Sequence, residues 1–161
     1  MPIVVGRRAK CVGVRRTPMA DLVLYDGVCG LCNRLNQFIL KRDSGDRFRF
    51  AALQSSIAGE LVQRYGRDAS DLNTVYVIVN YGAPDERLLS KGRAVLSVLR
   101  ALGGIWSLAR IFELLPSWLL DRLYDVVARR RYRWFGRFDA CVVPLPRDLS
   151  KFLDDGAPPR R

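Results

Sequence analysis

The feature that most constrains the fold of this chain is a six-residue run at 74–79, TVYVIV. The run is almost continuously apolar and rich in β-branched side chains, a composition that favours a strand. Because such a strand has no polar face to turn toward water, it has to be covered on both sides, as in sheets that carry helices on each face. We therefore expect residues 74–79 to be a central strand of an α/β sheet.

Strand and helix patterns alternate along the chain on both sides of this run. Residues 22–25 and 48–51 are short apolar or alternating segments typical of strands, and each is followed by apolar side chains at helical spacing. Downstream, turn residues lead into 86–90, which can pair back on the central strand as a hairpin partner. The helices predicted between and after these strands cover residues 29–42, 57–65 and 95–102.

Two further helices are predicted C-terminal to this unit, at 106–115 and 119–131, on either side of Pro116. Their leucine and aromatic content is of the kind found in interfacial membrane helices. Three acidic residues among them do not suit an anionic membrane surface, so we expect both helices to pack against the sheet instead. These acidic residues are Glu113, Asp121 and Asp125.

The length, charge and residue usage of the chain limit the classes of protein to which it can belong. A chain of 161 residues that is 49% apolar can bury the core of one domain without disulfide staples. The 27 basic residues outnumber the 16 acidic ones, which favours contact with nucleic acid, anionic lipid or acidic protein surfaces. The absence of histidine excludes Ser-His-Asp and Cys-His catalysis, as well as zinc sites that need imidazole.

We expect one domain between two unstructured ends. Residues 1–18 carry five cations and no acid, show no periodicity, and are predicted to be a disordered basic leader. The domain follows at 19–147, and residues 148–161 are predicted to be a flexible tail. Since no long apolar stretch follows the N-terminal charges, and none elsewhere is long enough to span a membrane, we expect a cytoplasmic protein with no transmembrane segment.

Cys29 and Cys32 form a Cys-x-x-Cys pair directly after the first predicted strand, at the opening of the first predicted helix. The unpaired N–H groups and the dipole at a helix N-terminus favour a thiolate over a thiol. We expect Cys29 to be the more acidic and more exposed sulfur and to attack disulfides, while Cys32 resolves the mixed disulfide. Zinc or iron–sulfur binding is disfavoured because the remaining cysteines, Cys11 and Cys141, are single and distant. An inert, buried pair is the other alternative.

Three segments of the sequence resemble the DCC family of thiol-disulfide oxidoreductases, which is named for an Asp-x-x-Cys-x-x-Cys motif. They are residues 24–33 (LYDGVCGLCN), 90–94 (SKGRA) and 131–144 (RYRWFGRFDACVVP), in this order. The resemblance implies a thioredoxin-like fold, a mixed sheet flanked by helices, with protein-disulfide reductase activity on a protein or small-molecule disulfide. No metal or tightly bound cofactor is implied. With the extra C-terminal helices, the predicted class is α/β and thioredoxin-like.

One departure from thioredoxin concerns the segment that faces the cysteines. Thioredoxins carry a cis-proline just before the central strand, whereas here Leu72 and Asn73 precede Thr74. Substrate docking must therefore differ from that of thioredoxin. Asn73 or Thr74 is the candidate for pairing with an extended substrate backbone.

Two further residues have roles that the sequence leaves open. Asp26, at the end of the first strand, can accept the proton of Cys32 as a general base, or it can simply cap the turn or the first helical turn. Cys141, beside Asp139, can approach the site as a third redox thiol, although a buried packing role is the more common one for such a residue. Cys11, in the leader, is not expected to take part.

The basic run at 129–137 supplies an alternative function. Its arginines are interleaved with aromatic side chains, which suits the phosphates and stacked bases of single-stranded nucleic acid. In that interpretation the protein is a basic nucleic-acid- or surface-binding module, and the Cys-x-x-Cys pair is incidental. Because the run also belongs to the family resemblance, we favour a redox role in which the arginines stabilise a thiolate or bind an acidic partner such as glutathione. We do not expect nucleic acid to be the partner.

Overall fold

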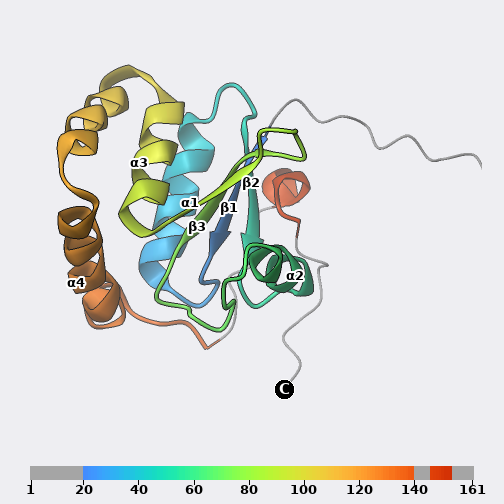
Figure 1. Cartoon of the computed structure of the whole chain (residues 1–161). Helices are drawn as coiled ribbons and strands as arrows, with labels where there is room; N and C mark the ends of the chain where they lie inside the picture. Colours follow the sequence, from blue (N-terminus) through green and yellow to red (C-terminus); the bar gives the residue numbers. More distant parts are fainter. Residues whose placement is uncertain (1–19, 140–145, 154–161) are drawn as a thin grey trace, which may run out of the picture.

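The computed structural model of the protein describes residues 20–139 and 146–153, and Figure 1 shows their arrangement. The predicted leader at 1–18, together with Cys11 and Cys141, lies outside the described residues. Within these ranges the elements follow the order β-α-β-α-β-β-α, with further helices after it. The predicted order is confirmed.

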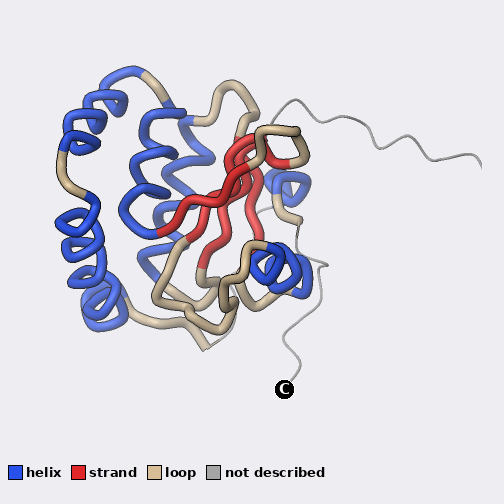
Figure 2. The backbone as a smooth tube through the Cα atoms, in the orientation of Figure 1, coloured by secondary structure: helices blue, strands red, loops and turns tan. Residues whose placement is uncertain are grey.

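Four strands form one mixed sheet (Figure 2). They are β1 (Ala20–Tyr25), β2 (Phe48–Ala52), β3 (Tyr76–Tyr81) and β4 (Arg87–Ser90). The order across the sheet is β2-β1-β3-β4, with β1 parallel to β2 and the other two pairs antiparallel. The predicted central strand is β3, which lies between β1 and β4. It begins at Tyr76 rather than at residue 74 because the hydroxyl of Thr74 donates to Asp71 in a turn that precedes the strand.

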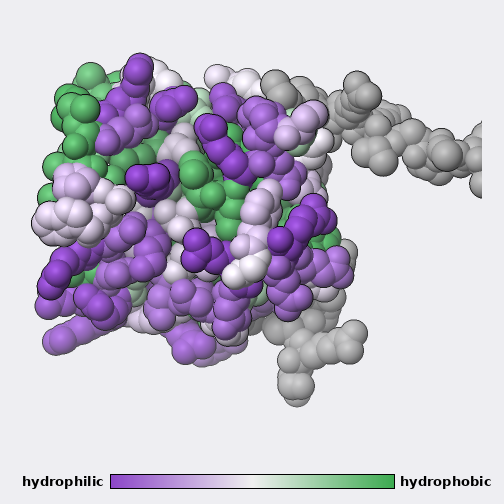
Figure 3. Space-filling model, viewed as in Figure 1, coloured by the Kyte–Doolittle hydropathy of each residue, from purple (hydrophilic) through white to green (hydrophobic). Residues whose placement is uncertain are grey.

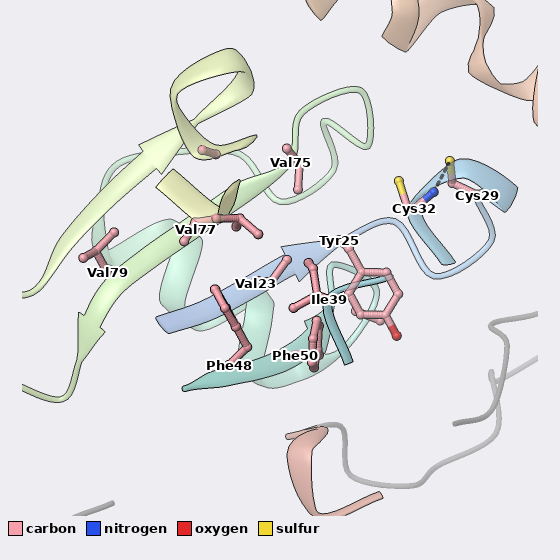
Figure 4. Close-up of a cluster of buried hydrophobic side chains, with 13 residues drawn as sticks. Val23, Tyr25, Cys29, Cys32, Ile39, Phe48, Phe50, Val75, Val77 and Val79 are labelled. Carbon is pink, nitrogen blue, oxygen red and sulfur yellow. Dashed lines mark hydrogen bonds between the residues drawn. The ribbon is translucent and has the colours of Figure 1, made fainter. Parts of the chain in front are cut away.

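Helices cover both faces of the sheet because side chains alternate along the strands. Val23 and Tyr25 of β1 pack with α1 and α3, whereas Leu22 and Leu24 pack with α2. The cluster on the α1 side also contains both cysteines of the Cys-x-x-Cys pair (Figure 4). The bounds of these helices are α1 Gly30–Arg42, α2 Ser56–Arg64 and α3 Lys91–Leu102.

The predicted packing of the C-terminal helices against the sheet is wrong. The 3₁₀ helix η1 (Gly104–Leu114) lies against α3, and α4 (Ser117–Phe135) lies against α3 and α1. The reason is that α1 and α3 already cover this face of the sheet, so the added helices form an outer layer (Figure 1). Tyr124 links α4 to the residue just before β3, since its hydroxyl accepts the N–H of Val75 at 2.8 Å. None of the helices in the described ranges combines the length and hydropathy that a bilayer crossing requires.

A short 3₁₀ helix, η2 (Pro146–Lys151), leads into two residues that lie at the free edge of β2. The N–H of Leu153 donates to the carbonyl of Phe50 at 2.8 Å, and the ring of Phe152 stacks on that of Phe50 with centroids 5.0 Å apart. This segment covers an edge that could otherwise pair with another strand. The domain end predicted at residue 147 falls inside η2, and residues 154–161 lie outside the described part of the chain.

A mixed sheet with helices on both faces, and with β1 and β2 parallel across α1, is the architecture of thioredoxin-like proteins. The predicted fold class, α/β and thioredoxin-like with additional C-terminal helices, is confirmed. This arrangement places the start of α1 at the end of β1. The loop before β3 and the last turns of α4 meet it there, since Arg131 contacts both Asp26 and Leu72.

Candidate active site

Cys29 occupies the N-cap position of α1, the residue immediately before the helix. Its backbone is extended, with φ −85° and ψ 121°, and its Sγ accepts the N–H of Cys32 at 3.3 Å (Figure 4). An N-cap side chain normally offers an oxygen to one of the unpaired N–H groups of the first turn, and here a sulfur does so. Because a thiolate accepts such a bond better than a thiol, the position favours deprotonated Cys29.

The pKa values of the two thiols are shifted in opposite directions. A side-chain hydrogen bond with Cys32 is the main cause that lowers the pKa of Cys29 to about 6; burial opposes it, while the Cys32 N–H and the charge of Arg131 add to it. The same bond, together with burial, raises the pKa of Cys32 far above its ordinary value. Cys29 is therefore the thiolate at neutral pH and Cys32 keeps its proton, in agreement with the predicted acidity of Cys29.

The predicted exposure of Cys29 is wrong. Its residue surface is 0% exposed and that of Cys32 is 9% exposed. The chain that follows α4, residues 136–138, is bonded to the backbone of residues 28–30, and we call this segment the cover. The backbone contacts that hold it are Gly30 N–H to Gly136 O at 3.2 Å, Phe138 N–H to Val28 O at 2.8 Å, and an antiparallel bridge between Cys29 and Arg137. Because Cys29 is buried, a disulfide can reach its sulfur only after residues around it move.

Asp26 is 1% exposed and accepts four hydrogen bonds. Its Oδ1 accepts the N–H of Val28 at 3.2 Å and the side-chain amide of Gln54 at 2.8 Å. Its Oδ2 accepts a guanidinium N–H of Arg131 at 3.0 Å and the hydroxyl of Tyr132. The Val28 contact is the turn cap predicted as one role of Asp26. The buried pair with Arg131 adds an electrostatic link between the strand end and α4 that the sequence did not indicate.

Arg131 is the arginine of the basic run that the structure places next to the cysteines, where the sequence analysis expected the run as a whole to stabilise a thiolate. Its side chain is 3% exposed, and besides Asp26 it donates to the carbonyl of Leu72 in the loop before β3. Arg131 and Asp26 act on both thiols with opposite sign, the first lowering and the second raising their pKa, and each acts less strongly than the hydrogen bond between the thiols. The helical spacing of Arg131 from Tyr124 and Ala128, which also face inward, is the signal that separates it from its exposed neighbours.

The loop proposed for substrate docking is bonded internally. The N–H of Asn73 donates to the carboxylate of Asp71 at 3.1 Å, and the N–H of Thr74 donates to the carbonyl of the same residue at 3.3 Å. The next N–H, that of Val75, donates to the hydroxyl of Tyr124. None of these three N–H groups is free to pair with a substrate backbone, so pairing there would require the loop to rearrange.

The described residues contain no group of three His, Cys, Asp or Glu side chains with the spacing of a metal site. Cys29 and Cys32 are free thiols, and Asp139 is exposed at the end of the described segment. The predicted alternatives for Cys141 cannot be placed, because this residue lies outside the described ranges. The chemistry that the described site can support is thus that of its two thiols and the buried charges next to them.

The fold and the site together define a class of protein: a thioredoxin-like domain with an acidic N-cap cysteine in a Cys-x-x-Cys pair. Comparison with known sequences specifies the family. Residues 23–137 match the family described as DCC1-like thiol-disulfide oxidoreductase. The chain belongs to this family, and the resemblance inferred from its motifs is confirmed.

Two curated relatives support the assignment. The uncharacterized protein YuxK of Bacillus subtilis (strain 168) is 34% identical over 132 residues, which cover 82% of this chain and 93% of that protein. A chloroplastic DCC family protein of Arabidopsis thaliana is 36% identical over 123 residues, which cover 76% of this chain and 69% of that protein. No solved structure matches the chain.

The contact between Gly30 and the end of α4 is tight enough to test. A Cβ at Gly30 would lie 2.1 Å from the carbonyl oxygen of Phe135, which is backbone and cannot rotate away. We expect Gly30→Ala to cost about 1–3 kcal/mol of unfolding free energy and to loosen the cover, so that Cys29 is alkylated faster at a fixed pH. Denaturant unfolding and mass spectrometry of the alkylated protein measure both effects.

Gly59→Ala is the matched control, because a Cβ there meets nothing within 4 Å inside α2. It should leave alkylation unchanged and stabilise the protein by about 0.5–1 kcal/mol. A Gly30→Ala protein as stable as the wild type, with the same alkylation rate, would contradict the packing described for the cover.

Proposed function

We propose that the protein catalyses dithiol–disulfide exchange, with Cys29 as the attacking thiolate and Cys32 as the resolving thiol. The observation that carries this proposal is the position of Cys29. Its sulfur caps α1 by accepting the Cys32 N–H, and its pKa is lowered to about 6. Membership of a thiol-disulfide oxidoreductase family supports the same activity.

The proposed cycle conserves sulfur and electrons. The Cys29 thiolate attacks one sulfur of a disulfide, forms a mixed disulfide and expels the other substrate sulfur as a thiolate, which is protonated by water. Cys32 then gives up its proton and attacks Sγ of Cys29, which releases the second substrate sulfur and leaves a Cys29–Cys32 disulfide. The substrate gains two electrons and the protein loses two.

The raised pKa of Cys32 suits this order of events. In the free dithiol it is raised mainly by the hydrogen bond to Cys29 and then by burial. Once Cys29 is bound in a mixed disulfide, its sulfur carries no negative charge and holds the proton of Cys32 less strongly. Cys32 therefore becomes reactive only after the substrate has been captured.

Asp26 is the residue we propose as the acceptor of the Cys32 proton. It is buried beside the site, and its charge acts on both sulfurs. Arg131 and Tyr132 hold its Oδ2, so that both are positioning residues in this proposal. The other role left open, a cap of the turn, uses Oδ1 and the N–H of Val28, and it is compatible with the first.

The substrate class in this proposal is a protein or small-molecule disulfide, with glutathione as the acidic partner that the exposed Arg137 suits. A reducing compartment such as the cytoplasm would make the protein a reductant, although one relative is named as chloroplastic. The competing interpretation, a basic binding module with an incidental cysteine pair, is weakened because Arg131 and Tyr132 of the basic run bind Asp26.

The unequal roles of the two thiols predict different failures of two mutants. Cys29→Ser should abolish attack on a disulfide, whereas Cys32→Ser should attack and then stall as a covalent mixed disulfide. Incubation with a protein disulfide, followed by non-reducing electrophoresis and mass spectrometry, detects the trapped species. Trapping by Cys29→Ser alone would reverse the roles, and unchanged disulfide reduction in both mutants would refute the proposal.

The pH dependence of Cys29 alkylation tests the hydrogen bond between the thiols. In the wild type the rate should rise with pH through about 6, because the thiolate is the reactive form. Cys32→Ala removes the donor that stabilises the thiolate, so the midpoint should move up toward about 8.5. Cys32→Ser keeps a hydroxyl donor, and its midpoint should stay nearer that of the wild type. Equal midpoints in all three proteins would mean that Cys32 does not set the pKa of Cys29.

The role of Asp26 can be tested with Asp26→Asn, which keeps an oxygen for the N–H of Val28 but removes the charge. If Asp26 accepts the proton of Cys32, the resolving step should slow by about 100-fold or more and the mixed disulfide should accumulate, while Cys29 still attacks. Rapid quenching with acid, followed by mass spectrometry, measures the two steps separately.

Asp43→Asn is the control for a purely structural loss. The side chain of Asp43 is also buried, and it accepts the backbone N–H groups of Arg47 at 2.9 Å and Phe48 at 3.1 Å, at the start of β2. We expect it to lower the melting temperature without changing the resolving step. An Asp26→Asn protein that behaves in the same way would show that Asp26 is only a cap.

A further inference from the structure

The side of η1 and α4 that faces away from α3 carries large apolar side chains in contact with solvent. The most exposed of them include Leu114, at 86%, and Trp118, at 65%, and no residue of η1 is buried. Figure 3 shows apolar surface gathered over η1, above the hydrophilic surface of α4. We call the exposed side chains of residues 105–134 the outer helical surface. An apolar area of this extent on a folded protein normally marks a surface that binds something.

Two rows of side chains run along the outward face of α4. Leu123, Val127 and Trp134 are separated by four and seven residues, so they line up on one strip of the helix. A second strip, roughly a third of the way around the helix, contains Arg122, Arg129 and Arg133, all exposed. The inward face, with Tyr124, Ala128 and Arg131, is used for packing on the domain, so neither strip is needed to hold α4 in place.

The acidic residues that argued against a membrane surface are directed elsewhere. Asp125 pairs with Lys91 at 3.0 Å, and Glu113 pairs with Arg100 at 3.8 Å. Both basic partners belong to α3, on the domain side of the outer layer. Asp121 is half-buried. The free charge presented by the outward strip is therefore that of its arginines.

We propose that the outer helical surface binds the surface of an anionic membrane. Its leucine, isoleucine and tryptophan side chains would enter the boundary between headgroups and acyl chains, with the arginines on lipid phosphates. A second copy of the chain fits less well, because it would bring like-charged arginines together. Nucleic acid fits less well too, since it offers no apolar phase for the aliphatic side chains. This inference goes beyond the proposed redox function and does not depend on it.

The test is sedimentation of the full chain with vesicles of phosphatidylglycerol and phosphatidylcholine, compared with phosphatidylcholine alone. We expect binding to the anionic vesicles that weakens as salt is raised. The double variant R129E/R133E should lower the partition coefficient by about tenfold or more, because two attractive charges near the lipid phosphates become repulsive. Trp118→Ser should lower it at constant charge.

The matched control is R64E/R67E, which makes the same change of charge at two exposed arginines at the end of α2, on the opposite face of the sheet (Figure 1). It should change the partition coefficient by less than about twofold, although the chain carries a formal charge of +11. Equal melting temperatures establish that the variants are folded.

Three outcomes would overturn the proposal. The first is no binding to anionic vesicles, and the second is equal loss of binding in R64E/R67E and R129E/R133E, which would mean attraction by net charge alone. The third is another occupant: single-stranded RNA that competes with the vesicles and requires Trp118, or a concentration-dependent dimer that shields Trp134 from a fluorescence quencher. Loss of disulfide reduction in a cysteine mutant that still binds vesicles bears on the proposed function and not on this surface.

Discussion

The buried ion pair between Asp26 and Arg131 is the interaction on which the rest of the site depends. It joins residues 105 positions apart in the sequence at 3.0 Å, and both side chains are almost completely withdrawn from water. Removing either partner would leave an unpaired charge in the interior, at a cost of about 3–5 kcal/mol. The pair therefore fixes the end of α4 against the loop that follows β1, and Leu72 is drawn into the same network through its carbonyl.

The candidate nucleophile, Cys29, is both acidic and buried. Cys29 owes its low pKa to local geometry at the start of α1, where Cys32 supplies the main hydrogen bond. The cover, which continues directly from α4, is bonded to the backbone on either side of Cys29. The chemistry requires some movement around Cys29, since a completely buried sulfur cannot meet a disulfide.

The two faces of α4 serve different purposes. The inward face contributes Arg131 and the Tyr124 hydroxyl, which contacts the backbone just before β3. The outward face carries exposed aliphatic and aromatic side chains together with exposed arginines. A membrane bound to this outward face would lie on the opposite side of α4 from Asp26.

Local pattern in the sequence determined the order of strands and helices, the central place of residues 74–79 and the N-terminal position of the cysteine pair on a helix, because each depends on neighbours within a few residues. The same pattern predicted the start of β3 too early, at residue 74, because the Thr74 hydroxyl bonds to Asp71 in a turn before the strand. Only tertiary structure decided that the C-terminal helices form an outer layer, that Arg131 is the buried arginine of its basic run, and that Cys29 is buried. The physical reason is that burial, ion pairing and access arise between segments about a hundred residues apart, and no local periodicity records which distant partner a side chain will meet.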